Sequence, residues 1–310
     1  MKVMMVIPCY NEELVLHETT RQLTEVLDNL QSKKKVDEWS IVYVDDGSKD
    51  ATWSIINEQH KTDKRIRGLK LAHNVGHQLA LWAGYEYAVD KADAVISMDA
   101  DLQHDIRSIG DMIEQYRAGC DVVYGVRNDR ATDGWIKKQT ALGFYRLMQW
   151  MGVDIIKNHA DYRLLSNRAL KALVSYPERN IFIRGLVRTL GFKETEVHFD
   201  VKERIAGKSK YTARKMLNFA LDGITSFSVQ PLRLIASLGI MIIIMSVCAA
   251  IYVLVSYLLD RLAPGWSSLL LSIWFIGGVQ LLSVGILGEY IGKIYKETKQ
   301  RPRYIVEDEI

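Results

Sequence analysis

The sequence predicts an α/β protein in which a mostly parallel sheet flanked by helices is followed by a two-helix transmembrane hairpin. Short apolar runs alternate with segments of helical periodicity over the first 130 residues or so, which is typical of βαβ units. Polar clusters directly follow several of the predicted strands. Two long runs, Leu234–Leu259 and Ser267–Gly288, contain no charged residue, and each is long enough to cross a hydrocarbon core of about 30 Å as a helix.

The predicted strands are short, apolar and bounded by turn residues. We expect strands at Lys2–Pro8, Ser40–Val44, Ile66–Leu71, Ala94–Met98 and Asp121–Val126. Apolar residues at helical spacing between them predict helices at Glu12–Gln31, Ala51–His60, Gln78–Asp90 and Ile106–Ala118. The strict alternation of the two kinds of element favours a parallel sheet with helices on both faces.

The pattern weakens after Arg127. We expect helices at Ile136–Met151 and Ser166–Val174, a polar loop at Asn158–Arg163 and a basic loop or hairpin at Phe199–Tyr211. The segment Tyr211–Phe227 combines basic and aromatic residues with an apolar stripe, which suits either a helix lying in the membrane interface or an ordinary amphipathic helix packed on the domain.

Polar residues stand where three of the predicted strands end. Asp45-Asp46, Asp99-Ala100-Asp101 and Arg127 all occupy such positions. Ligands of open α/β sheets bind beyond the carboxyl ends of the strands. The sequence therefore predicts a binding site at this edge of the sheet.

The Asp99-Ala100-Asp101 motif predicts a metal site. Alternate carboxylates in a turn can face one hard cation, and Mg²⁺ or Mn²⁺ prefers oxygen ligands together with substrate phosphates. Such a motif alone also fits a solvated turn, but its place after a strand favours the site. Asp45-Asp46-Gly47-Ser48 fits a nucleotide contact or, equally, a turn that caps the next helix.

Two other features are interpreted more plainly. Ile205-Ala206-Gly207-Lys208-Ser209 lacks the first glycine of a P-loop, so it is a cationic loop able to bind phosphates or the basic flank of a membrane helix. The histidines His73, His77 and His104 show no metal-ligand spacing and are expected to be loop or surface residues.

Charge and cysteine content limit the partners and the compartment. The net charge is only +3, which does not indicate a nucleic-acid binder. The three cysteines are scattered, as expected in a reducing compartment, and no secretory signal peptide is expected. Lysine and arginine are concentrated on both outer flanks of the apolar hairpin, so we expect a multi-pass membrane protein with both chain ends, and with them the polar N-terminal part, in the cytoplasm.

Taken together, these residues resemble the family 2 glycosyltransferases of the GT-A fold, and in particular the polyprenyl-phosphate sugar transferases such as the bactoprenol glucosyltransferases and dolichol-phosphate mannose synthase. The resemblance covers essentially the whole chain. It rests on the ordered segments Val6–Glu12, Val44–Ser48, Met98–Gln103, Gly125–Arg127, Asp161–Arg163 and Arg204–Tyr211, followed by the hairpin.

The resemblance implies a role for each matching position. Pro8, Tyr10, Glu12, Val44 and Asp46 would hold the nucleotide, while Asp99, Asp101 and Gln103 would hold the metal and the donor diphosphate. Arg127, Arg204 and Lys210 would contact phosphates. Catalysis would rest on Asp101, Asp161 and Arg163, with the last two near the acceptor and the reacting sugar carbon, and with Asp161 more plausibly an orienting group than an essential base.

The implied reaction is inverting transfer of a sugar from a nucleotide sugar, with UDP-glucose as first choice, to undecaprenyl or another polyprenyl phosphate, for modification of cell-envelope glycans. The alternatives are UDP-N-acetylglucosamine, UDP-galactose, GDP-mannose or an aminoarabinose derivative as donor, or a non-catalytic nucleotide-sugar-binding membrane scaffold. A processive polysaccharide synthase is disfavoured because Gln149-Trp150 lacks the motif that such enzymes carry. Bacterial members of the family suggest a homotetramer.

The expected domain boundaries follow from these assignments. Residues 1–210 would form the cytoplasmic GT-A catalytic domain and residues 211–233 the interfacial helix region. The two transmembrane helices would lie within 234–288, at about 234–259 and 267–288, and residues 289–310 would form a cytoplasmic basic tail.

Overall fold

The computed structural model describes residues 1–128, 150–151, 159–200, 224–225, 228–258 and 265–310. These residues divide into two compact units. The first lies within 1–146, 154–213 and 301–310, and the second within 147–153 and 214–300. The expected features at 136–149, 201–211 and most of 211–227 lie outside the described residues, as do Arg204 and Lys210.

The first unit is built on one mixed eight-stranded sheet with the strand order β7-β5-β6-β4-β1-β2-β3-β8. Strands β1 to β4 run parallel where they pair, whereas β6 is antiparallel to both β4 and β5, and β8 is antiparallel to β3. The strands are β1 Lys2–Cys9, β2 Glu38–Asp45, β3 Ile66–Leu71, β4 Ala94–Ser97, β5 Val122–Arg127, β6 His159–Ser166, β7 Glu194–Phe199 and β8 Val306–Glu309.

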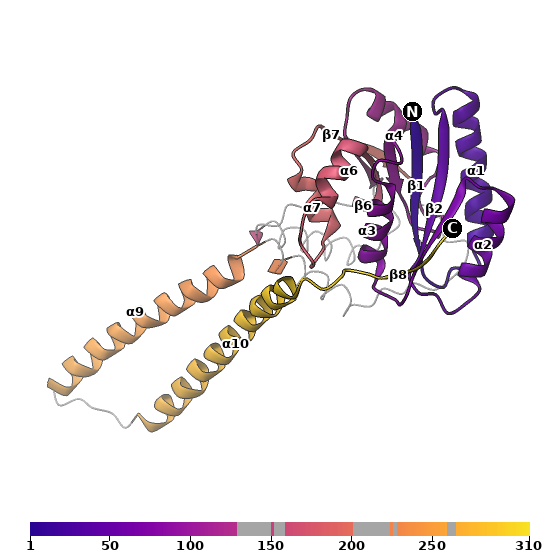
Figure 1. The fold of residues 1–310 in the computed structure, drawn as a ribbon. Helices are drawn as coiled ribbons and strands as arrows, with labels where there is room; N and C mark the ends of the chain where they lie inside the picture. The colour runs from indigo at the N-terminus through magenta and orange to yellow at the C-terminus, as the bar shows by residue number, and fades with distance from the viewer. Residues whose placement is uncertain (129–149, 152–158, 201–223, 226–227, 259–264) are drawn as a thin grey trace. The chain divides into compact units, whose positions relative to one another are not determined.

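Helices cover both faces of this sheet (Figure 1). One face carries α1 (Leu16–Ser32), α2 (Thr52–Thr62) and α4 (Ser108–Arg117), and the other carries α3 (His77–Ala88) and α6 (Asn167–Val174). A short helix α7 (Ile183–Thr189) precedes β7. This arrangement confirms the predicted α/β class with a mostly parallel sheet.

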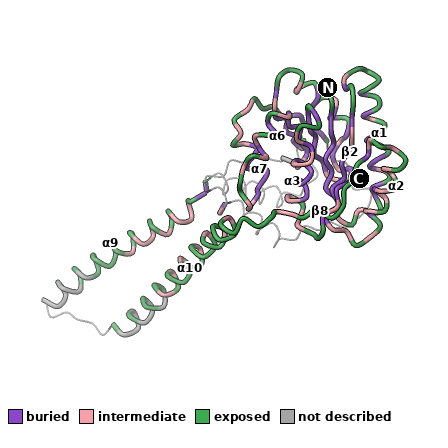
Figure 2. Tube along the Cα trace, viewed as in Figure 1, coloured by how far each residue is buried: buried purple, intermediate pink, exposed green. Residues whose placement is uncertain are grey.

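The main core lies between the sheet and the helices α1 and α4. Figure 2 shows the strands as the most buried part of the trace. Apolar residues three or four positions apart lie on one face of each helix, and this face packs against the sheet. The core includes Leu16, Leu23 and Leu27 of α1, Ile109, Met112 and Ile113 of α4, and Met5, Ile7, Ile41, Tyr43, Ile96 and Leu164 of the strands.

On the opposite face, α3 packs unusually close to β1. A Cβ atom added at Gly84 would stand 2.3 Å from the Cγ1 atom of Val6 and 3.0 Å from Cγ2 of Val44. Only glycine permits this approach, which brings the first residue of α3, His77, toward the carboxyl ends of the strands.

The expected loop at Asn158–Arg163 was wrong for the residues that the structure describes, because His159–Ser166 forms β6. Tyr162 and Leu164 belong to the main core, while Asp161 and Arg163 alternate with them and so point to the other face of the sheet. Because charged residues occupy one face of this strand, the segment lacks the continuous apolar run by which the other strands were predicted. The helix after it is confirmed, and the hydroxyl of Ser166 caps it by accepting from the N–H of Ala169 at 3.1 Å.

The C-terminal residues 301–310 belong to the first unit, where β8 extends the sheet beyond β3. The Arg303 guanidinium donates to Glu86 Oε1 at 2.9 Å and to the Tyr176 carbonyl at 2.6 Å, and it lies over the Trp82 ring. The expected tail at 289–310 therefore contains an ordered strand. Its charged, exposed residues gave no periodic signal.

The second unit contains two long helices, α9 (Gln230–Leu258) and α10 (Trp266–Lys299). Stretches within them, Gln230–Ala249 and Phe275–Lys299, are long and apolar enough to cross a membrane, and none of either stretch is buried inside the structure. A core helix of a soluble protein would be mostly buried, so this exposure favours the predicted hairpin.

Candidate active site

The carboxyl ends of the central strands gather the predicted site residues. Cys9 at the end of β1 lies in register with Asp45 at the end of β2, and Asp99 follows β4, which pairs with β1 on its other side. Pro8 and Val44 are also neighbours in this register, and both are buried. Tyr10 and Glu12, just beyond β1, are partly exposed at the same edge.

The Asp45-Asp46-Gly47-Ser48 turn is held by hydrogen bonds within the chain. Asp45 Oδ1 accepts from the N–H of Ser48 at 3.1 Å, while its buried Oδ2 has no hydrogen-bond partner among the described residues. Gly47 adopts φ +65°, and a Cβ there would come within 2.7 Å of the His73 backbone. The turn therefore requires glycine.

Asp46 ties this turn to the loop that precedes α3. Its Oδ1 accepts from the N–H of Val75 at 2.7 Å and its Oδ2 from the N–H of Gly76 at 3.0 Å. Burial raises the pKa of Asp46, although these two hydrogen bonds oppose the shift. Both oxygens thus have partners in the chain, and the predicted nucleotide contact would have to use their remaining acceptor capacity.

The Asp99–Gln103 segment forms the expected turn. Asp101 Oδ1 accepts from the N–H of Gln103 at 3.2 Å, and Leu102 between them takes the left-handed φ of +55° although it is buried. Burial of the Leu102 side chain holds a conformation that costs about 1–3 kcal/mol. This fixed turn presents two carboxylates, and the Asp99 side chain remains 35% exposed.

The donor set of this turn fits a hard divalent cation, although no cluster of three metal-ligating His, Cys, Asp or Glu side chains occurs within the described residues. Mg²⁺ commonly binds through one or two carboxylates and completes its shell with water and substrate phosphates. Asp99, Asp101 and the Gln103 amide offer such a partial oxygen set.

Asp161 on β6 lies at the centre of a cationic cluster. Arg184 of α7 donates to both of its oxygens, at 3.1 and 2.9 Å, and Arg163 Nη2 donates to Oδ1. Burial alone would raise the pKa of Asp161, but Arg184, His77 and Arg163 hold it well below its usual range. Asp161 is therefore charged at neutral pH and, with its oxygens already accepting from Arg184 and Arg163, is poorly suited to accept a proton.

Arg163 is fully buried, and its Nε and Nη1 groups have no hydrogen-bond partner among the described residues. A buried guanidinium with unused donors is costly to a protein unless water or a ligand accepts from them. Behind it, Tyr85 donates to Ser97, whose hydroxyl donates to the Asp161 carbonyl, each at 2.9 Å. These contacts fix the β4–β6 pair at the site.

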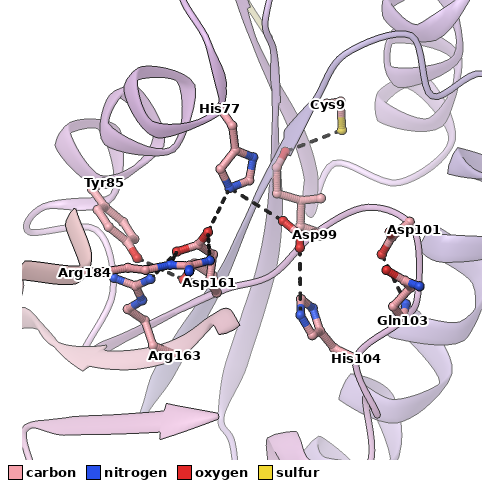
Figure 3. Close-up of polar contacts among 12 residues, drawn as sticks. Cys9, His77, Tyr85, Asp99, Asp101, Gln103, His104, Asp161, Arg163 and Arg184 are labelled. Atoms are coloured by element: carbon pink, nitrogen blue, oxygen red, sulfur yellow. Dashed lines mark hydrogen bonds and ion pairs between the residues drawn. The ribbon is translucent and has the colours of Figure 1, made fainter. Parts of the chain in front are cut away.

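His77 joins the two carboxylate regions (Figure 3). Its Nε2 atom lies 3.6 Å from Asp99 Oδ1 and 3.5 Å from Asp161 Oδ2. Burial would lower the pKa of His77, but the two carboxylates outweigh it and raise this pKa to about 9. The sequence interpretation as an ordinary loop or surface histidine missed this contact.

His104 is only 1% exposed and lies on the other side of Asp99, with Nε2 3.8 Å from Asp99 Oδ2. Its ring stacks on Tyr162 at 5.1 Å and meets Phe199 edge-on at 5.4 Å. Burial lowers the pKa of His104, so the neutral ring predominates at neutral pH. The sequence suggested a loop or surface histidine, whereas His104 is buried and lies beside the Asp99 carboxylate.

The structure thus brings Asp99, Asp101, Gln103, Asp161 and Arg163 to one edge, together with Arg127 at the end of β5. His77, His104 and Arg184 were missed. For His77 the available signal was its place directly after the Asn74-Val75-Gly76 turn that opens a helix. Arg184 lies on a seven-residue helix with no marking pattern.

Comparison with known proteins shows one family. The model of glycosyl transferase family 2 matches residues 4–174. The chain is 52% identical over 303 residues to the uncharacterized glycosyltransferase YkoT of Bacillus subtilis (strain 168), covering 97% of this chain and 90% of that protein. It is 40% identical over 314 residues to the bactoprenol glucosyl transferase of Shigella phage SfV, covering 100% of this chain and 99% of the relative.

Among solved structures, glucosyl-3-phosphoglycerate synthase from Mycobacterium tuberculosis, in complex with Mn²⁺, UDP-glucose and phosphoglyceric acid, aligns with 72% of this chain and 77% of its own. The sequence identity is 15% and the TM-score 0.46. The likeness is too distant to bear on ligands.

Proposed function

This chain belongs to the family 2 glycosyltransferases, and from that premise we propose that it transfers a sugar from a nucleotide sugar to a polyprenyl phosphate at a membrane surface. The observation that supports this most directly is that a partly exposed carboxylate, Asp99, and a fixed anion, Asp161, lie close together at the edge where the strands end. The apolar helices α9 and α10 support a lipid acceptor, as does near-full-length similarity to a bactoprenol glucosyl transferase.

In the proposed reaction, an oxygen of the acceptor phosphate forms a bond to the anomeric carbon as the bond from that carbon to the nucleoside diphosphate breaks. In-line attack inverts the anomeric centre. The acceptor phosphate is already anionic at neutral pH, so no strong base is needed. This agrees with an Asp161 whose oxygens already accept hydrogen bonds from Arg184 and Arg163 and that acts by orienting its neighbours.

The leaving diphosphate needs stabilisation as its charge grows. Asp99, Asp101 and Gln103 would hold Mg²⁺ or Mn²⁺, which supplies a positive charge beside the diphosphate when bound. Arg127, with a buried Nε that lacks a described hydrogen-bond partner, would donate to a phosphate, as would Arg204 and Lys210. Pro8, Tyr10, Glu12 and Val44 would enclose the nucleotide.

The donor is proposed to be UDP-glucose, because the relative named above is a glucosyl transferase. The test is a donor screen with purified protein, undecaprenyl phosphate and Mn²⁺. We expect one sugar nucleotide to yield a chloroform-soluble sugar lipid. UDP-N-acetylglucosamine, UDP-galactose, GDP-mannose and an aminoarabinose donor are the comparison arms. Binding of a nucleotide sugar without any lipid product would instead favour a non-catalytic scaffold.

The proposed location is the inner membrane, with two spans, both chain ends in the cytoplasm and the domain boundaries predicted above. Lysines and arginines flank the outer ends of the apolar runs, which favours this orientation. In a background without Cys9, Cys120 and Cys248, a membrane-impermeant thiol reagent on intact cells should label Ser267→Cys and spare Lys299→Cys. The reverse labelling would contradict the orientation. Gel filtration with light scattering tests the suggested homotetramer.

A further inference from the structure

The loop at residues 74–76 is built around one buried carboxylate. Asp46 is 3% exposed, and its two oxygens accept from the N–H groups of Val75 and Gly76 at 2.7 and 3.0 Å. Its carbonyl accepts from the Asn74 side-chain amide at 3.2 Å. Asp46, directly after β2, therefore forms a hydrogen bond to each of three consecutive residues of this loop.

This loop leads directly into His77, the first residue of α3. Gly76 has φ +94°, a conformation that other residues rarely adopt, and it turns the chain so that α3 begins with the histidine. The second residue of α3 is also held, since the Gln78 side chain accepts from the N–H of Ile183 at 3.0 Å. The position of His77 is thus set by Asp46 on one side and by the start of α7 on the other.

His77 is the one side chain among the described residues that forms ion pairs with both Asp99 and Asp161. These carboxylates come from the two differently oriented parts of the sheet, since Asp99 follows the parallel strand β4 and Asp161 lies on the antiparallel strand β6. The His77 side chain is 42% exposed, so it stands at the surface that a ligand would reach and is not a core histidine.

We propose that Asp46 and His77 are positioning residues that act as one unit: Asp46 fixes the 74–76 loop, and the loop places His77 between Asp99 and Asp161 so that the two carboxylates keep their spacing. This rests on the proposed function, because the spacing matters only if both carboxylates serve one transfer reaction. It assigns Asp46 a role other than the nucleotide contact expected from the sequence.

The two roles of Asp46 predict different kinetics. A nucleotide contact contributes to donor binding, so its loss raises KM and the dissociation constant for the nucleotide. A positioning residue changes the geometry of reacting groups, and a misplacement of about 1 Å can lower turnover by about 10²-fold. Its loss lowers kcat and leaves nucleotide affinity nearly unchanged.

The test is a double-mutant cycle of Asp46→Asn and His77→Leu, with His73→Leu as the control because His73 is an exposed histidine of the same loop. We expect each site variant to lower kcat about 10- to 100-fold, with UDP affinity by calorimetry within about threefold of wild type. The double variant should be no slower than His77→Leu alone, His77→Lys should recover most of the loss, and His73→Leu should match wild type.

Independent multiplication of the two kcat effects, or a tenfold weaker UDP affinity in Asp46→Asn with normal kcat, would overturn the proposal. The Tm values of the same four proteins (wild type, the two single variants and the double variant) give a second readout that does not depend on sugar transfer. If wild type transfers no sugar from any donor, the proposed function fails, while additive Tm changes would separately rule out the coupling and non-additive changes would support it.

Discussion

Asp99 and Asp161 lie against the same histidine, yet their surroundings differ in a way that separates their roles. Asp99 follows β4 in a short turn, is 35% exposed, and faces two histidines at 3.6 and 3.8 Å. Asp161 lies within β6, is 15% exposed, and receives donors from Arg163 and Arg184. One carboxylate is open to a ligand and the other is already neutralised, so a shared location does not imply a shared function.

The largest expected effect is on transfer by Asp99→Asn. Loss of the open carboxylate removes a ligand for the proposed cation, and groups that stabilise developing charge are worth about 10²–10³ in turnover. We therefore expect a fall in kcat of at least about 10²-fold with little change in Tm. Asp111→Asn, an exposed aspartate on α4, is the matched control and should retain full activity. Normal turnover in Asp99→Asn would remove the distinction between the two carboxylates.

Asp161→Asn should instead cost stability. Removing one member of a buried ion pair leaves the partner charges uncompensated, and this costs about 3–5 kcal/mol. Chemical denaturation of both variants measures the contrast, since Asp99→Asn should change the free energy of unfolding by less than about 1 kcal/mol. The control is Asp121→Asn, which breaks an ion pair with Arg168 at the opposite end of β5 and should leave the rate of sugar transfer unchanged. An Asp161→Asn protein as stable as wild type would contradict this description of Asp161.

Arg184→Lys sharpens the same contrast with a smaller change. Lysine keeps the charge but cannot form the paired hydrogen bonds to Asp161, so we expect a loss of about 1.5 kcal/mol in stability from one missing charged hydrogen bond. Arg188→Lys is the control on the same helix, because Arg188 pairs with the more exposed Glu194 and should change stability by less than about 1 kcal/mol. Equal losses in the two variants would show that the Asp161 cluster is not special.

We also expect a pH dependence of stability that is due to His77. Its pKa rises from 6.5 to about 9 on folding, so its stabilising effect is complete below pH 6.5 and is lost as the pH rises through 9. The Tm of the metal-free protein should fall over this window, and His77→Leu should flatten the fall. Differential scanning calorimetry at several pH values measures this, with His73→Leu as the control that keeps the wild-type slope.

The sequence predicted the part of the fold that follows ordinary apolar patterning. Strands β1 to β5 and helices α2 to α4 agree with the predicted segments to within a few residues, and α1 begins later because Glu13–Val15 forms a turn. The turn at Asp99–Gln103 was also predicted, since short polar motifs after apolar strands depend on local sequence. These elements need no information about distant contacts.

The missed features depend on tertiary structure. Strand β6 alternates charged and apolar residues, because one of its faces lines the site, and β8 is stable only by pairing with β3. The site role of Arg184 depends on the approach of α7 to β6, and that of His77 on Asp46 more than two dozen residues earlier. No local pattern marks such contacts.

The most direct test of the account is a comparison of one enzyme sample in three states, with UDP-glucose, or whichever donor the screen selects, and undecaprenyl phosphate in detergent. The sample is assayed as purified with Mn²⁺, after thorough chelation with EDTA, and after Mn²⁺ is restored, and sugar in the chloroform phase is measured. We predict product in the first and third states and a loss of at least about 10²-fold in the second. Full transfer by the chelated enzyme, or no lipid product in any state, would contradict the assignment of Asp99 as the open metal-binding carboxylate of a polyprenyl-phosphate glycosyltransferase.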